Sequence, residues 1–188
     1  MDDIYRAAFL IVLTIASTSK ARSDTEYPSR WPKPIQGTSD GCVTLSGRYS
    51  YRGEPDRPDR GGAPTIDRAA FNRMSVRGYP QTATFEHEVK TGVLNVHIEG
   101  RDISPPDRAS FSRQLKCEGG WWVYSLQFGD CQGAAVTPRS CSRVRLLYTR
   151  TEDRSLIVHF TGSKDSESSV GDVKKTSVDA WYRFGLVP

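Results

Sequence analysis

Residues 117–131 read CEGGWWVYSLQFGDC and hold two of the four tryptophans and two of the four cysteines of this 188-residue chain. Trp122, Tyr124, Leu126 and Phe128 recur at every second position. This spacing is typical of a β-strand with one buried face. The stretch therefore predicts the central strand of a β-rich domain.

A hairpin is expected just before this strand. Glu118-Gly119 suits a two-residue turn, because glycine tolerates the positive φ that such turns need. The preceding strand would then pair back in a defined register, with Leu115 opposite Trp122, Arg113 opposite Tyr124 and Phe111 opposite Leu126.

The same alternation recurs along the chain and predicts eight strands. A second hairpin is expected around Thr91-Gly92, with Val89 opposite Leu94, His87 opposite Val96 and Phe85 opposite Ile98. A short helix is expected from Thr65 to Met74, and residues 163–175 are expected to form a polar loop. The pattern indicates an all-β fold, an eight-stranded antiparallel up-and-down barrel with one short helix; a two-sheet β-sandwich is the alternative.

The N-terminal part of the chain indicates export. The apolar run at residues 7–16 is too short to cross a bilayer as a helix and resembles the core of a secretory signal. We expect a signal peptide at 1–23, a Pro-rich linker at 24–41 and the β-barrel domain at 42–188. An uncleaved anchor or a buried helix is the alternative for the apolar run. The expected location is periplasmic or secreted, with no stable membrane span after signal cleavage.

The four cysteines predict two disulfides, as is usual in exported proteins. Pairing of the strands around 121–128 and 142–150 would bring Cys131 close to Cys141. Cys42 is then left to pair with Cys117. No CxxC pair or suitable histidine spacing supports a metal site.

Charge and motifs restrict the function. The formal net charge is +4, from 26 basic and 22 acidic residues. So small a surplus disfavours a nucleic-acid partner, which selects a concentrated basic surface. The sequence contains no Gly-x-Ser-x-Gly, His-Glu-x-x-His or phosphate-binding loop, so no catalytic residue, enzyme class or cofactor is predicted.

Several polar side chains fall on inward strand positions. They would give a cavity an apolar wall with a few convergent polar groups, as small-molecule sites have. The alternative is that they fill the interior, with their polar ends at the rim. The candidate ligand-binding residues are Tyr49, Tyr51, His87, Arg113, Tyr124 and Tyr148.

Two short motifs carry a resemblance. Leu45-Ser-Gly-Arg-Tyr49 and Trp181-Tyr-Arg-Phe184 resemble the first and last strands of calycins, the small barrels that include lipocalins. The resemblance implies a ligand-binding barrel whose first and last strands are neighbours, with Arg183 stacked on Tyr49, which replaces the usual tryptophan. The start at Cys42 also resembles exported lipoproteins of Gram-negative bacteria, although no lipidation cysteine follows the apolar run.

These observations favour an exported, non-enzymatic binding module for a small ligand or a protein partner. One alternative is an inhibitor or immunity-type protein that masks a toxin. Another is a hydrolase whose site has no recognisable motif.

Overall fold

A computed structural model describes residues 26–35, 37, 41–57, 63–72, 76–105, 109–129, 140–167 and 173–188. The predicted signal peptide at 1–23 lies outside the described residues, and so do Met74 and Cys131. No helix in the described ranges is long and apolar enough to span a membrane.

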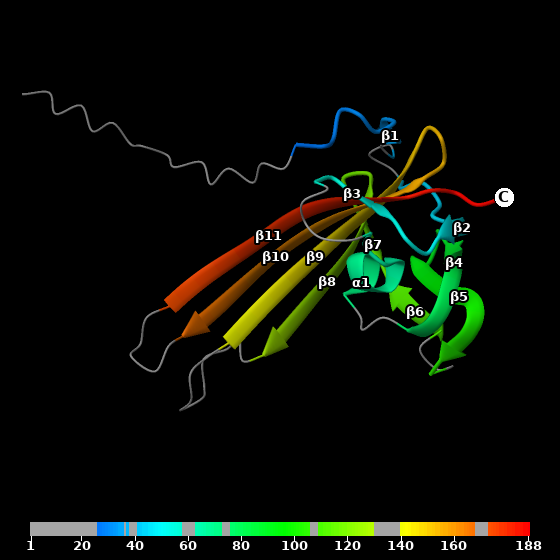
Figure 1. The fold of residues 1–188 in the computed structure, drawn as a ribbon. Coiled ribbons are helices and arrows are strands. Elements are labelled where there is room, and N and C mark those ends of the chain that lie inside the picture. The colour runs from blue at the N-terminus through cyan, green and yellow to red at the C-terminus, as the bar shows by residue number, and fades with distance from the viewer. Residues whose placement is uncertain are drawn as a thin grey trace, which may run out of the picture.

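The prediction of an all-β fold with one short helix is confirmed (Figure 1). The elements are β1 (Pro34–Ile35), β2 (Gly47–Ser50), β3 (Glu54–Pro55), α1 (Ile66–Phe71), β4 (Arg77–Glu88), β5 (Val93–Ser104), β6 (Ser110–Gln114), β7 (Lys116–Glu118), β8 (Trp121–Gly129), β9 (Ser140–Thr151), β10 (Leu156–Glu167) and β11 (Val173–Phe184).

The strands form two antiparallel sheets. The large sheet has the order β3-β11-β10-β9-β8-β7, with β1 added along β9. The small sheet has the order β2-β4-β5-β6. The ladders of the described strands therefore do not close into the predicted single barrel, because β6 pairs with β5 and not with β8.

The chain crosses between the sheets at two places. Only Leu115 separates β6 of the small sheet from β7 of the large sheet. On the other side, the residues after β11 run along β2, with an isolated bridge between Tyr49 and Leu186. Backbone hydrogen bonds flank that bridge, from Ser50 N to Gly185 O at 2.8 Å and from Val187 N to Arg48 O at 2.7 Å.

A core of aromatic and aliphatic side chains lies between the sheets and under α1. Phe71 of α1 packs against Phe85 of the small sheet and Tyr148 of the large sheet, with ring centroids 5.7 and 5.9 Å apart. The helix ends at Phe71, earlier than predicted, because Asn72 adopts the left-handed conformation with φ of 50°. The largest fully buried side chains are Tyr49, Tyr51, Tyr148, Phe71, Phe85, Phe184, Leu45, Ile66, Leu94, Ile98, Leu146 and Leu156.

Both predicted hairpin registers are wrong by two residues, and in the first hairpin the predicted partners Arg113 and Phe111 pair with β5 rather than with β8. Cys117 pairs with Trp122 and Glu118 with Trp121, so the turn is Gly119-Gly120, with φ of +58° and +83°. Two consecutive glycines allow this turn, since it needs positive φ at both central positions.

The other hairpin has a four-residue turn, closed by Gly92 N donating to Glu88 O at 2.8 Å, and His87 consequently pairs with Leu94. Val89 thus lies in the turn rather than on the strand. A shift of two residues keeps every side chain on its predicted face, because strand side chains alternate with period two.

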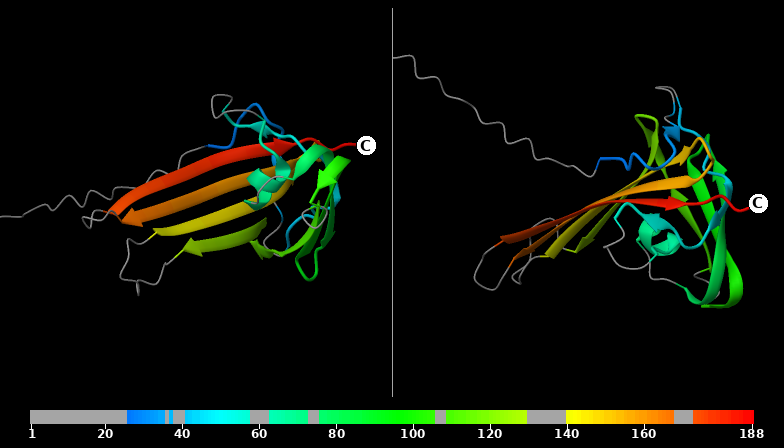
Figure 2. Two further views of the ribbon diagram at one scale, coloured as in Figure 1. Left: turned by 60° about the horizontal axis from the view of Figure 1, so that its bottom comes forward. Right: turned by 45° about the horizontal axis from the view of Figure 1, so that its top comes forward.

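The large sheet is longer than predicted. Residues 163–167 and 173–175, expected in a polar loop, extend β10 and β11, with Asp165 paired to Lys175. Figures 1 and 2 show the distal halves of β8 to β11 leaving the body beyond the small sheet, while α1 lies in the corner between the two sheets. Among the described elements, therefore, no second sheet faces this part of the large sheet.

Part of the expected linker packs on the outer face of the large sheet. Trp31 is buried with Ile157 and Trp181, and its Nε1 donates to Glu54 Oε1 at 3.0 Å. Tyr27 packs edge-on against Trp181, with the ring centroids 5.3 Å apart. The described part of this segment therefore packs against the large sheet instead of extending away from it.

The predicted Cys42–Cys117 disulfide is present and links residues separated by 75 positions. It joins the chain before β2 to β7. None of the cysteines in the described ranges is free. The predicted Cys131–Cys141 pair includes a residue outside those ranges.

Candidate ligand-binding site

The six predicted binding residues divide into two groups. Tyr49, Tyr51 and His87 are buried where the sheets pack together. The Tyr49 hydroxyl donates to Leu45 O at 2.9 Å, and the Tyr51 hydroxyl donates to Asp67 Oδ2 at 2.8 Å. These tyrosines fill the core and satisfy their hydroxyls there, which is how buried tyrosines usually behave.

His87 also has a structural environment. Its Nδ1 accepts a hydrogen bond from Leu45 N at 3.2 Å, and its ring lies edge-on to Trp122 with centroids 4.4 Å apart. Burial lowers the pKa of His87 to about 4, so the imidazole is neutral at physiological pH.

Arg113, Tyr124 and Tyr148 form the second group and come together. The Arg113 guanidinium carbon lies 5.5 Å from the centroid of the Tyr124 ring and 5.1 Å from that of Phe111. Tyr148 lies close to both, and its hydroxyl donates to Ala70 O of α1. Burial raises the pKa of Tyr148 well above its ordinary value. A cation thus sits over aromatic rings at the point where the two sheets separate.

The separation of β6 from β8 creates this corner. Lys116 pairs with Val123, but Arg113 pairs with Leu94 of β5 rather than with β8. From Tyr124 onward, β8 therefore runs away from the small sheet. Arg113 reaches across the resulting opening toward Tyr124.

Beyond the corner, the inner face of the large sheet stays apolar up to the row of positions that contains Phe128, Ser142, Lys164 and Thr176. We call this surface the open apolar face; its residues are Tyr124, Leu126, Phe128, Val144, Phe160 and Val178. Phe128 is 45% exposed and Val178 is 48% exposed. The Phe160 ring lies against Gly162, where an added Cβ would be 3.2 Å from the ring. Partly exposed, contiguous apolar side chains of this size are a common feature of interaction surfaces.

The alternation in the sequence identified the strand positions of the open apolar face but assigned them to a closed interior. They remain partly open because the small sheet ends before the large one does (Figure 2).

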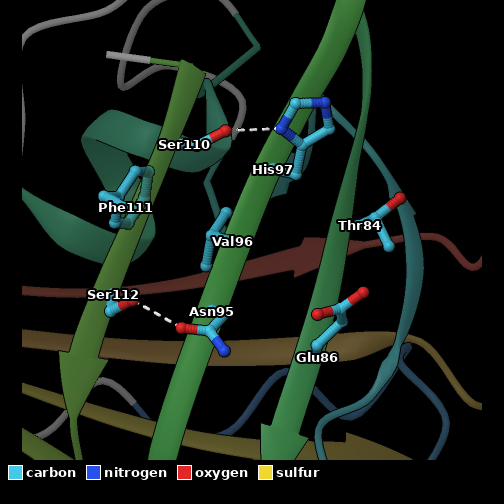
Figure 3. Close-up of a pocket in the computed structure, with 8 residues that line it drawn as sticks. All are labelled: Thr84, Glu86, Asn95, Val96, His97, Ser110, Phe111 and Ser112. Carbon is cyan, nitrogen blue, oxygen red and sulfur yellow. Dashed lines mark hydrogen bonds between the residues drawn. The ribbon is translucent and has the colours of Figure 1, made fainter. Parts of the chain in front are cut away.

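A second surface, polar and shallow, lies on the outer side of the small sheet (Figure 3). It encloses about 510 Å³ and is lined by Thr84, Glu86, Asn95, Val96, His97, Ser110, Phe111 and Ser112. Here His97 Nδ1 lies 2.5 Å from Ser110 Oγ, and Ser112 donates to Asn95.

Ser110 and His97 invite comparison with a hydrolase. Two acids lie nearby. Glu86 lines the same hollow, and Glu99 accepts hydrogen bonds from Arg48, Thr82 and Thr84. Within the described part of the chain, no carboxylate hydrogen-bonds His97, so the orienting acid of a serine hydrolase is not in place. The polar side chains of this hollow largely satisfy one another.

The contact implied by the calycin resemblance is not formed. Arg183 points to the outer face, where it contacts Asp153 Oδ2 at 2.5 Å and Glu54 Oε2 at 3.5 Å. Tyr49 is instead covered by Leu186. Alternation explains the difference, since Arg183 and Phe184 occupy opposite faces of β11.

No group of three His, Cys, Asp or Glu side chains in the described ranges is placed to hold a metal ion. Comparison with protein-family models, with curated proteins and with solved structures finds no match for this chain.

Proposed function

We propose that this protein is an exported, non-enzymatic binding module whose ligand packs against the open apolar face. The observation that carries the proposal is the continuity of this face. It continues the core without a break: beyond the fully buried Leu146 of the core come the half-buried Val144 and then the exposed Val178. A ligand placed there would remove apolar surface from water without disturbing the core.

The accessibility of the inner face also supports a finer description of the sheet arrangement. We infer a barrel that is closed on one side through Tyr49 and Leu186 and opened on the other between β6 and β8. The opening makes the apolar inner face accessible. Export is supported by the Cys42–Cys117 disulfide, because disulfides persist in oxidising compartments.

The test is titration with the neutral, environment-sensitive dye Nile red. We expect the wild-type protein to enhance its fluorescence, and Phe128→Ser and Val178→Ser to weaken that enhancement at least several-fold. Tyr79→Ser is the matched control, because Tyr79 is 70% exposed on the small sheet, away from this face.

Equal enhancement in all four proteins would contradict the proposal. Native mass spectrometry of protein taken from its own cells gives a second test. A small copurifying mass supports the proposal, whereas a copurifying protein favours the inhibitor-type alternative.

A further inference from the structure

We propose that the ligand is a single-chain amphiphile with an anionic head group, which Arg113 binds while the alkyl chain lies along the open apolar face. This inference rests on the proposed function and adds the chemical class of the ligand.

Arg113 is the first reason. Its Nη1 donates to Ser112 O at 2.8 Å, but its Nε is buried without a hydrogen-bond partner. A buried donor without an acceptor costs free energy, and more so on a charged group. No carboxylate in the described part of the chain pairs with this guanidinium. Carboxylate, sulfate and phosphate oxygens are the acceptors that match its geometry.

The charge of the inner face is the second reason. Lys164 occupies the same face of β10 as Phe160, beyond Gly162. Asp165 and Asp179 occupy the opposite, outer face. Among the described inner positions of β8 to β11 there is no acidic residue, so an anion is attracted to this face. A second copy of the chain would bring like charges together.

Shape favours one amphiphile over a bilayer. The distal part of the large sheet leaves the rest of the molecule at an angle, and α1 lies in the corner between the two sheets (Figure 2). Arg113 is near α1, because it lies over the ring of Phe111, whose centroid is 4.9 Å from that of Phe71 of α1. A flat membrane surface could touch Phe128 and Val178 but would not reach into this corner. From Tyr124 to Phe128 the strand is about 13 Å long, which suits a chain of about ten carbons.

The experiment compares three ten-carbon amphiphiles below their micellar concentrations: decanoate, decanol and decyltrimethylammonium. Each compound is titrated into the full-length, oxidised protein with bound Nile red, and the loss of dye fluorescence is measured. We expect decanoate to act at concentrations at least tenfold lower than decanol, with the cation weakest. Added salt should reduce the advantage of the anion.

Variants assign the effect to Arg113. Arg113→Met should abolish the preference, so that decanoate and decanol act at similar concentrations, whereas Arg113→Lys should keep part of the preference for decanoate. Arg143→Met is the matched control, because Arg143 lies on the outer face and pairs with Asp165 at 3.5 Å. It removes the same charge and should keep the full preference. The preference of the wild type is measured without any variant, so poor folding of Arg113→Met leaves the test intact.

The outcomes are separable. Equal displacement by decanoate and decanol overturns this inference but leaves the proposed function standing. No dye binding and no displacement overturn both. Binding to anionic vesicles with no response to monomeric decanoate overturns the inference in favour of a membrane surface, and a dimer that excludes the dye overturns it in favour of self-association.

Discussion

Tyr49 and Leu186 form an isolated antiparallel bridge that joins the small sheet to the segment following the last strand of the large sheet. Gly47 permits this close approach, since a Cβ there would lie 3.0 Å from the Tyr49 hydroxyl oxygen and 3.1 Å from Leu186 Cδ1. The bridge covers the β2 edge of the small sheet, which would otherwise be unpaired.

Replacing Leu186 by alanine should therefore loosen this connection. We expect a loss of about 1–2 kcal/mol, because the side chain is only partly buried against the core. Amide exchange at Ser50 and Val187 should accelerate, since their hydrogen bonds flank the bridge. Val178→Ala is the control and should change stability by about 0.5 kcal/mol or less. Unchanged exchange at both amides in Leu186→Ala would show that the bridge does not hold the sheets together.

His87 should make stability depend on pH. Burial lowers its pKa from 6.5 to about 4. Between pH 6.5 and about 4, His87 is protonated in the unfolded chain but not in the folded chain. Stability is therefore greatest above pH 6.5 and falls as the pH drops toward 4, by up to ~3 kcal/mol from this group.

Urea unfolding across this pH range measures the effect. His87→Gln should flatten the dependence between pH 6.5 and 4, because glutamine can accept the Leu45 amide without titrating. His97→Gln is the matched control on the exposed face and should keep the wild-type slope. The same slope in His87→Gln and wild type would contradict the assignment.

The Cys42–Cys117 disulfide should contribute strongly to stability, because it links residues 75 positions apart. Replacing both cysteines by serine should lower the free energy of unfolding by about 4 kcal/mol on the chain-entropy estimate. Alkylation of the denatured, unreduced wild type should leave both cysteines unmodified. Their modification would mean that the bridge does not form in the protein.

The Gly119-Gly120 turn should tolerate alanine differently at its two positions. Both glycines have positive φ, so either substitution costs about 1–2 kcal/mol of backbone strain. A Cβ at Gly119 meets nothing within 4 Å, whereas one at Gly120 would lie 2.7 Å from Gly37 O. Gly120→Ala should therefore be the more destabilising variant. It should also speed proteolysis in the segment around Trp31. Equal stability and equal proteolysis of the two variants would contradict this expectation.

The sequence by itself determined which side chains share a face. Period-two alternation placed Trp122, Tyr124 and Leu126 on the inner side of β8, and that assignment survives the two-residue register shifts, because an even shift preserves the face. It also predicted the Cys42–Cys117 disulfide, through the order and spacing of the cysteines.

Turn lengths and partners were decided by tertiary structure. Gly119-Gly120, rather than Glu118-Gly119, forms the turn, because only that placement puts both glycines at the positions with positive φ. Trp181 lies on the outer side of β11, and the alternation of the sequence carries no sign of what covers it there. Trp31 does so, from a segment without any periodic pattern.

The candidate site shows the same division. Arg113 and Tyr124 were predicted to face inward and to lie together, and they do, although β6 and β8 are not paired there. That the face beyond them stays open depends on the lengths of the two sheets. Alternation records the side to which a residue points, whereas burial depends on whether another layer reaches that position, and only packing of the whole chain decides this.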